Sequence, residues 1–324
     1  MDVNALADGV ADGDRKSLAR AIPLVESARA DHREQALALL SLLRGLDRQA
    51  LRLGLSGTPG VGKSTFIESF GCRLTEAGKR VAVLAIDPSS ARTGGSILGD
   101  KTRMERLSRD PRAFIRPSPS QSQMGGVARR TREVVALCEA AGFDLVLIET
   151  VGVGQSETMV AQMCDIFLLL LAPAGGDELQ GVKRGIMEVA DLILVNKADG
   201  DLKPAAMRTA ADYAVALRLL RHRPQDPPGF PKVLPVSAET GDGLAGAWDE
   251  IASLAAWRRE NGHWQARRAD QSRGWFEEEV RQGLLARLSR EPMKGVLERL
   301  GQEVAGGQRT PEAAAAELLA MVGR

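Results

Sequence analysis

The sequence predicts an α/β protein built on a doubly wound, mostly parallel sheet, with helical extensions at both ends. Six short apolar runs are bounded by turn residues, and they are nearly continuous rather than alternating, as is typical of strands covered by helices on both faces. The segments between them are long enough for the crossover helices that parallel strands require. The expected strands are LRLGLSG from residue 51, RVAVLAID from 80, FDLVLIET from 143, IFLLLLAP from 166, LILVNKAD from 192 and KVLPVSAE from 232.

The helical extensions set the expected domain boundaries. Residues 1–46 contain apolar positions at helical spacing and predict two helices, with Pro23 near a helix start. Residues 47–256 carry the strands. Residues 257–324 form a charged helical arm in which Phe276, Val280, Leu284 and Leu288 recur at i, i+4 spacing. The arm is a candidate for dimerisation, although docking onto its own core is an equal alternative, and its arginines are expected on a solvated face.

Composition narrows the class of protein. Lys and Arg total 43 against 42 Asp and Glu, a net charge of +1, which argues against a general nucleic-acid or membrane-surface binder. Cys72, Cys138 and Cys164 lack metal-ligand spacing and are expected to be small core residues. No secretory signal or membrane span is apparent, so a cytoplasmic protein is expected.

The stretch LGLSGTPGVGKSTF, residues 53–66, has the spacing G-x-x-x-x-G-K-S after an apolar run. In this P-loop motif, backbone N–H groups converge on phosphates, and the following helix directs its positive dipole end at the same anion. Lys63 is expected to reach the β- and γ-phosphates, and Ser64 to ligate Mg²⁺. The residues expected at the phosphates are Gly57, Thr58, Gly60, Val61, Gly62, Lys63, Ser64 and Thr65.

Three acidic residues are candidates for holding Mg²⁺ directly or through water. Glu149 ends the run LVLIE, Asp87 ends VAVLAID, and Asp100 lies in the glycine-rich loop TGGSILGDKTR. A single acid at a strand end is more often a helix cap, but its combination with a P-loop favours metal binding.

The segment NKAD, residues 196–199, ends another strand, where a base-recognition loop is expected. An aspartate accepts hydrogen bonds from guanine N1–H and the exocyclic amine, neither of which adenine offers, so Asp199 predicts GTP as the nucleotide. The segment SAE from residue 237 is expected to support the base through backbone groups. The candidates at the base are Asn196, Lys197, Asp199, Ser237, Ala238 and Glu239.

Two loops are expected to sense the γ-phosphate or a partner. In ETVGVGQSE, residues 149–157, Gly152 can donate its N–H to the γ-phosphate, but Val153 stands where Ras-like GTPases have a water-orienting glutamine. Unassisted hydrolysis should therefore be slow, unless Gln155 compensates. In APAGGDELQGVKRG, residues 172–185, Lys183 could offset transition-state charge once a partner orders the loop, although a solvated loop is the alternative.

The second of these loops supplies the switch candidates Gly175, Gly176, Asp177, Gln180 and Lys183. The catalytic candidates of the whole chain are Lys63, Asp87, Gly152 and Lys183.

The sequence resembles the methylmalonyl-CoA-mutase-associated GTPases, also called the MeaB or ArgK family. The resemblance rests on GTPGVGKST, AIDPSS, TGGSILGDKTRM, ETVGVGQSE, PAGGDELQGVKRGI and NKAD, with GDRKSLARAIPLVES near the N-terminus also similar. It implies a homodimeric SIMIBI-class P-loop GTPase that chaperones an adenosylcobalamin-dependent acyl-CoA mutase. GTP binding and hydrolysis would then gate cofactor delivery from an adenosyltransferase and help to protect or reactivate the mutase.

The resemblance also assigns roles to individual residues. Lys63 and Ser64 match the family's P-loop, and Asn196 and Asp199 match its base-recognition motif. Residues 175–185 match its additional switch loop, which implies that Lys183 supports catalysis. The acids that match the family's magnesium and γ-phosphate positions are Asp87, Asp100 and Glu149.

Two other functions share parts of this pattern. A nickel-insertion GTPase has the same fold class but needs soft or imidazole ligands, and His32, His222 and His263 are widely spaced. A P-loop kinase for a small molecule would need an acceptor pocket and, given NKAD, an unusual preference for GTP. The chain lacks the D-x-H-x-x-G segment of cobalamin-binding domains, so the cofactor is expected to be held by partners.

Overall fold

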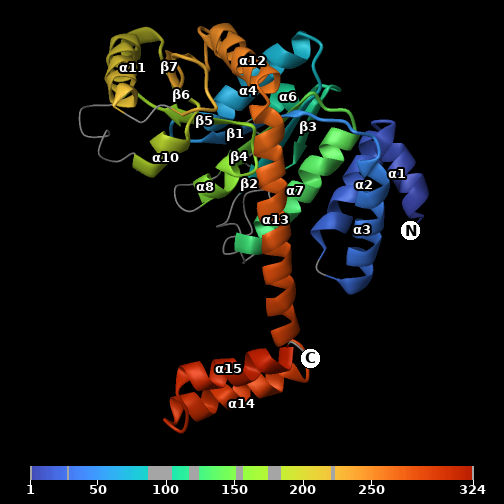
Figure 1. The fold of residues 1–324 in the computed structure, drawn as a ribbon. Helices are drawn as coiled ribbons and strands as arrows, with labels where there is room; N and C mark the ends of the chain where they lie inside the picture. Colours follow the sequence, from blue (N-terminus) through green and yellow to red (C-terminus); the bar gives the residue numbers. More distant parts are fainter. Residues whose placement is uncertain are drawn as a thin grey trace. The chain divides into compact units, whose positions relative to one another are not determined.

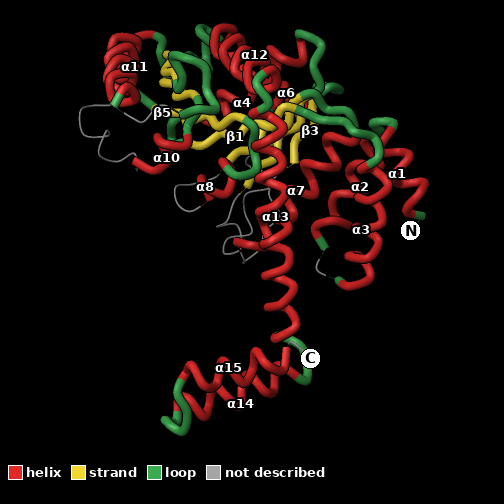
Figure 2. Tube along the Cα trace, viewed as in Figure 1, coloured by secondary structure: helices red, strands yellow, loops and turns green. Residues whose placement is uncertain are grey.

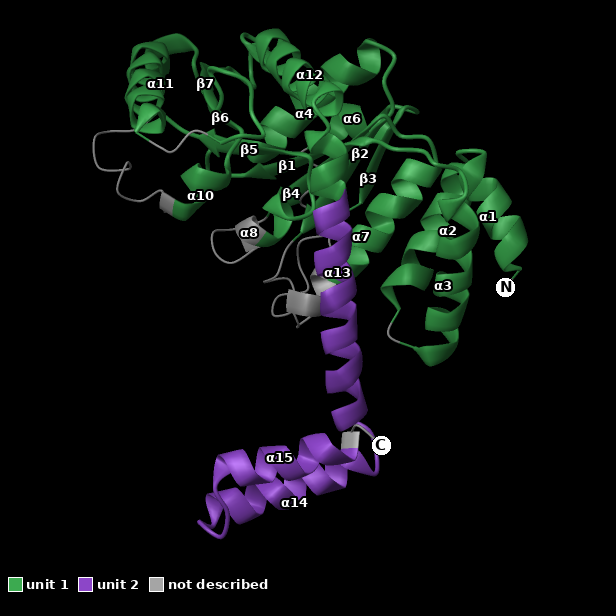
Figure 3. Ribbon diagram, viewed as in Figure 1, with its two compact units in different colours: residues 1–268 green, residues 269–324 purple. Residues whose placement is uncertain are grey.

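The computed structural model describes residues 2–27, 29–86, 104–116, 124–150, 156–173, 184–219 and 223–322. These residues divide into two compact units, residues 1–268 and 269–324 (Figure 3). Across the described residues, every helix is too short or too polar to cross a lipid bilayer.

The first unit is built on a seven-stranded sheet with the order β3-β2-β4-β1-β5-β6-β7, and every described strand pairing is parallel. The prediction of a doubly wound parallel sheet is thus confirmed. Six strands coincide with the predicted runs, whereas the edge strand β3 was not predicted. The strands are β1 (Leu51–Ser56), β2 (Val81–Ile86), β3 (Ala113–Arg116), β4 (Leu145–Thr150), β5 (Ile166–Leu171), β6 (Leu192–Val195) and β7 (Lys232–Pro235).

Helices cover both faces of this sheet (Figure 2). Alternate side chains of the central strands pack with Phe66 and Phe70 of α4 (Lys63–Glu76) and Ile251 of α12 (Leu244–Glu260). Helices α7 (Met124–Ala140) and α8 (Ser156–Ala161) contact the strands from the other side (Figure 1). Burial on both faces explains why these strands read as continuous apolar runs.

Shorter helices complete the layers around the strands. Helix α10 (Arg184–Val189) contacts β5 and α8, and α6 (Glu105–Arg109) lies between α4 and β3. The 3-10 turn η1 (Gly200–Leu202) leads from β6 into α11 (Lys203–Arg218), which packs on β6 and β7. Each strand is therefore followed by a helix or turn that returns the chain to the sheet, as a parallel topology requires.

Three helices precede the sheet: α1 (Val3–Ala11), α2 (Arg15–Glu26) and α3 (Ala30–Arg44). Only two were predicted. Asp14 caps α2 by accepting hydrogen bonds from the N–H groups of Lys16 and Ser17 at 3.2 and 2.8 Å. The expectation that Pro23 lies near a helix start is wrong, because it lies in the last turn of α2.

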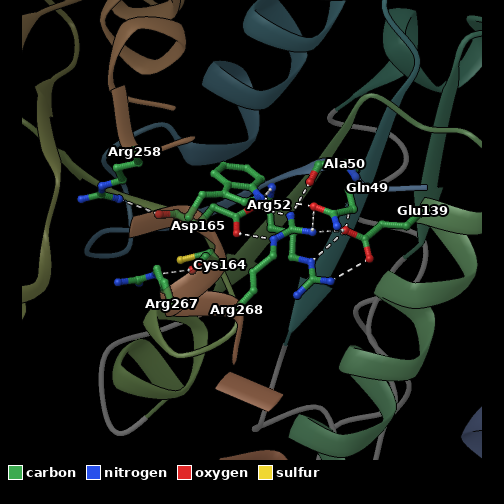
Figure 4. A network of polar contacts seen from close by, with 10 residues as sticks. Gln49, Ala50, Arg52, Glu139, Cys164, Asp165, Arg258, Arg267 and Arg268 are labelled. Carbon is green, nitrogen blue, oxygen red and sulfur yellow. Dashed lines mark hydrogen bonds and ion pairs between the residues drawn. The ribbon is translucent and has the colours of Figure 1, made fainter. Parts of the chain in front are cut away.

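A buried polar network joins the amino-terminal ends of the strands (Figure 4). Arg258, 2% exposed, donates to Asp191 at 2.6 Å, to the Asp165 carbonyl at 2.6 Å and to a carboxylate oxygen of Asp226. Arg268 bonds Asp165 at 2.7 Å and lies 3.3 Å from Glu139. The prediction of a solvated face is therefore wrong for these two arginines.

The three cysteines are buried, as expected of core residues. Cys72 lies in α4, Cys138 in α7, and Cys164 just before β5. Burial raises the pKa of the Cys138 and Cys164 thiols, which keeps both protonated at neutral pH.

The second unit contains α14 (Met293–Ala305), α15 (Pro311–Val322) and the part of α13 (His263–Leu288) that follows residue 268. Leu300, Ala314 and Leu318 form its small core. Along α13, Phe276 is 67% exposed, and Val280 and Leu284 are each 46% exposed. Three of the four residues of the predicted apolar stripe are therefore exposed, whereas Leu288 packs against the small core.

Candidate functional site

The phosphate loop connects the carboxyl end of β1 to the first turn of α4, which begins at Lys63. A parallel sheet presents its ligand-binding loops at this edge. The Lys63 ammonium donates to the carbonyl oxygens of Gly57 at 2.6 Å and Thr58 at 3.3 Å, so it is held at the loop itself. Ser64 is half-buried at the start of the helix, and Thr65 is exposed.

Close backbone approach explains two of the loop's glycines. A Cβ at Gly57 would lie 2.3 Å from the Leu170 carbonyl oxygen of β5. At Gly62, φ is +90° and a Cβ would lie 2.7 Å from Asn196 Nδ2. A side chain at either position would push the loop away from these neighbours and disturb the backbone conformation in which its N–H groups can converge on an anion.

The segment that is predicted to recognise the base is hydrogen-bonded to the phosphate loop. Asn196, 1% exposed, donates from Nδ2 to the Val61 carbonyl at 2.9 Å and accepts from the Ala238 N–H at 2.9 Å. The sequence predicts Asn196 at the base, but it does not indicate that this residue connects the loops after β1, β6 and β7. Only the folded chain brings these three loops together.

Asp199 lies beside the loop that follows β7. Its carboxylate accepts a hydrogen bond from the hydroxyl of the fully buried Ser237, and that hydroxyl accepts from the Thr240 N–H at 3.1 Å. Lys197 adopts a left-handed backbone conformation, with φ of +58°. Ala238 is buried and Glu239 is exposed. Two pairs of the predicted base-binding residues are therefore hydrogen-bonded, Asn196 with Ala238 and Asp199 with Ser237.

Among the predicted acids, Glu149 is 4% exposed and pairs with Leu55 of β1 in the sheet register. The next residue, Thr150, donates to Ser56 Oγ at 3.0 Å and so links the carboxyl ends of β4 and β1. Glu149 therefore lies on the strand beside the one that leads into the phosphate loop. Asp87, Asp100, Gly152, Gly175, Gly176, Asp177, Gln180 and Lys183 lie outside the described residues.

Comparison with known proteins identifies the family of this chain. Residues 18–293 match the family model described as "Methylmalonyl Co-A mutase-associated GTPase MeaB". The chain belongs to the MeaB family. Like the other members of this family, it is a GTPase related to methylmalonyl-CoA mutase, and it binds guanine nucleotides.

Individual relatives agree with this family. The chain is 47% identical to "Methylmalonic aciduria type A homolog, mitochondrial" of Mus musculus, over 98% of this chain and 79% of the mouse protein. It is 47% identical to "GTPase ArgK" of Escherichia coli, over 85% of this chain and 83% of that protein. The solved structure of a LAO/AO transport system kinase superposes with a TM-score of 0.77 at 35% identity, covering 99% and 98% of the two chains.

A matched pair of glycine substitutions tests the contact between Asn196 and the phosphate loop. Gly60 and Gly62 both have positive φ, of +85° and +90°, but a Cβ at Gly60 would meet nothing within 4 Å. Gly62→Ala is therefore expected to weaken GTP binding about tenfold more than Gly60→Ala, because only Gly62→Ala adds a steric clash. Titration with a fluorescent GTP analogue measures both constants. Equal losses would mean that the Asn196 contact does not position the loop.

Proposed function

We propose that this GTPase binds an adenosylcobalamin-dependent acyl-CoA mutase of the methylmalonyl-CoA mutase type. It couples GTP binding and hydrolysis to delivery, protection or reactivation of the mutase cofactor. Membership of the MeaB family is the observation that carries this proposal. The name of the mouse relative refers to methylmalonic aciduria, and it supports a role in the same area of metabolism.

The nucleotide site follows from the geometry of the loops. The N–H groups of residues 57, 58 and 60–65 and the Lys63 ammonium hold the phosphates, and Asp199 accepts from the guanine ring. The close contacts at Gly57 and Gly62 fit this role, because they leave no room for a side chain where the loop packs against its neighbours. Mg²⁺ would offset phosphate charge from a position held by Ser64 and the acids Asp87, Asp100 and Glu149.

Hydrolysis by the isolated chain is slow, because Val153 cannot orient the attacking water as a glutamine would. The mutase accelerates it by ordering the loop of residues 175–185, which brings the Lys183 ammonium to the charge that develops on the phosphates. Gly152 donates its N–H to the γ-phosphate, and Asp87 is the remaining catalytic residue.

The chain acts as a cytoplasmic homodimer with three parts, residues 1–46, 47–256 and 257–324. The exposed stripe of Phe276, Val280 and Leu284 supports dimerisation through the last part, because burial against a second copy would remove this apolar surface from water. Cobalamin is held by the mutase and by an adenosyltransferase, not by this chain.

The test is phosphate release from GTP and ATP by the purified protein, alone and with an adenosylcobalamin-dependent methylmalonyl-CoA mutase. We expect slow GTP turnover, no ATP turnover and acceleration by the mutase. Lys183→Ala should lose the acceleration but keep the basal rate within about threefold, because the basal reaction does not use the ordered loop.

The control for that assay is Lys203→Ala, at an exposed lysine of α11. It should keep the acceleration. A mutase that changes nothing would contradict the proposed partner, and nickel enzymes or a small-molecule phosphate acceptor would then be tested in its place.

A further inference from the structure

The hydroxyl of Ser69 joins the helix after the phosphate loop to the loop after β7. It donates a hydrogen bond to the carbonyl oxygen of Ala238, 169 positions further along the chain. Ala238 is 3% exposed and belongs to the segment SAE that is predicted to support the guanine base. Ser69 itself lies outside both the phosphate-loop motif and the base-recognition motif.

Ala238 is held from both sides. Its N–H donates to Asn196 Oδ1 at 2.9 Å, and its carbonyl accepts from the Ser69 hydroxyl. Asn196 in turn donates from Nδ2 to the Val61 carbonyl of the phosphate loop at 2.9 Å. The loop after β7 is therefore attached twice to the part of the chain that follows β1, once through Asn196 and once through Ser69.

Helix α4 holds the Ser69 hydroxyl in a fixed position. Phe66 and Phe70 of the same helix are fully buried, and their stacked rings have centroids 5.1 Å apart. The Phe70 ring also packs against Trp248 of α12, with centroids 6.1 Å apart. Because closely packed aromatic side chains resist displacement of the helix that carries them, the bond from Ser69 fixes the position of its acceptor.

The loop after β7 transmits this support to Asp199. Ser237 directly precedes Ala238, and its N–H donates to the Asp242 carbonyl at 2.8 Å, which closes this part of the loop on itself. The Ser237 hydroxyl donates to the Asp199 carboxylate. Because Ser237 and Ala238 share a planar peptide unit, release of the Ala238 carbonyl would also displace the hydroxyl that holds Asp199.

Ser69 is too far along α4 to act on the phosphates. It lies five residues after Ser64, which at the usual rise of a helix is roughly 7.5 Å along the axis. The field of a helix N-terminus acts mainly within the first turn, and Ser69 lies in the second. Its contribution is therefore expected at the base and not at the phosphate bond that is cleaved.

We infer that Ser69 is a positioning residue for guanine recognition. It holds the Ala238 carbonyl, so that Ser237 and the Asp199 carboxylate keep the arrangement that the base requires. This role rests on the proposed nucleotide site, to which it adds a residue that none of the motifs includes. Ser69 acts on the affinity for the nucleotide and not on the chemical step.

The test is steady-state GTP hydrolysis by the full chain with Mg²⁺, over a range of GTP concentrations. We expect Ser69→Ala to raise KM about tenfold, the cost of one hydrogen bond, and to leave kcat within about twofold. Because hydrolysis by the isolated chain is expected to be slow, KM reports the affinity for GTP. The rate at which a fluorescent GDP analogue dissociates should rise by a similar factor.

Two variants separate positioning from a general effect on folding. Ser69→Thr keeps the hydroxyl and should stay within about threefold of the wild-type KM, because the hydrogen bond is retained. Ser108→Ala removes a bond of the same kind, from a serine hydroxyl to the Glu105 carbonyl at 2.9 Å in α6, and should leave KM unchanged. A loss of folded protein lowers kcat and leaves KM unchanged, and this pattern in Ser69→Ala would overturn the inference.

Inosine triphosphate tests whether the effect passes through Asp199. Its base lacks the exocyclic amine that Asp199 is proposed to bind, so Ser69→Ala should weaken it less than it weakens GTP. Equal weakening of the two nucleotides would also overturn the inference. A wild type that prefers GTP to ATP, with Ser69→Ala unchanged, contradicts the role of Ser69 alone. A wild type without that preference contradicts the proposed base site as well.

Discussion

Asp199→Asn is expected to weaken GTP binding about a hundredfold or more and to create binding of xanthosine triphosphate. In the proposed site the carboxylate would accept two hydrogen bonds from guanine, each worth about 1.5–3 kcal/mol because the acceptor is charged. An asparagine presents one donor group in place of an acceptor, which opposes the guanine amine but complements the carbonyl that xanthine has at the same position. Competition against a fluorescent guanine nucleotide measures both affinities.

Ser237→Ala is the matched control for this change. The Ser237 hydroxyl donates to Asp199 and so helps to position the carboxylate. Its loss should weaken GTP binding by about tenfold, the cost of one hydrogen bond, and should not create binding of the xanthine nucleotide. Unchanged GTP affinity in Asp199→Asn would show that the base is recognised elsewhere.

Asp191→Asn is expected to lower the free energy of unfolding by about 3–5 kcal/mol, because it removes the charge that compensates a buried cation. Asp191 pairs with Arg258 at 2.6 Å and with Arg223 at 3.0 Å, and the Asp191 and Arg258 side chains are each 2% exposed. Urea denaturation monitored by circular dichroism measures the change. The control is Asp31→Asn, whose partner Arg29 is 69% exposed and which should unfold like the wild type.

The same pair predicts how stability depends on pH. Burial alone would raise the pKa of the Asp191 carboxyl, but Arg258 and Arg223 overcome it and hold the pKa below its usual value of 3.8. The folded state therefore binds this proton more weakly than the unfolded chain does. The stabilisation that the ionised Asp191 gives to the folded state is fully present above about pH 4. It is lost as the pH falls through the lowered pKa of this carboxyl. Asp191→Asn should lack this part of the acid dependence.

The parallel sheet and the phosphate loop were predictable because both have local sequence signals. Apolar runs with helical spacers mark buried parallel strands, and G-x-x-x-x-G-K-S marks its own loop. The edge strand β3 was not predicted, because the strand is only four residues long and only its first residue is fully buried. Pro23 was placed at a helix start because proline is common there, although the last turn of α2 also accommodates it.

The polar contacts could not be predicted, because each joins residues far apart in the sequence. Asp165, Asp191 and Asp226 look like ordinary loop charges until the strands bring their ends to one edge around Arg258. Asn196 is recognisable as part of NKAD, but its bond to Val61 spans 135 residues. Tertiary packing decides which buried groups meet, and the spacing of these residues in the sequence does not indicate it.

The carboxyl and amino ends of the strands form two edges of the sheet that have separate roles. The distance between these two edges affects how the protein can evolve. The nucleotide loops lie at the carboxyl edge, and the Arg258 network lies at the amino edge. A six-residue strand such as β1 places the edges about 20 Å apart, which is beyond the roughly 7–10 Å over which substitutions usually interact. Changes in the two regions should therefore combine additively. A lineage could alter nucleotide turnover or partner choice without first acquiring compensating changes in stability.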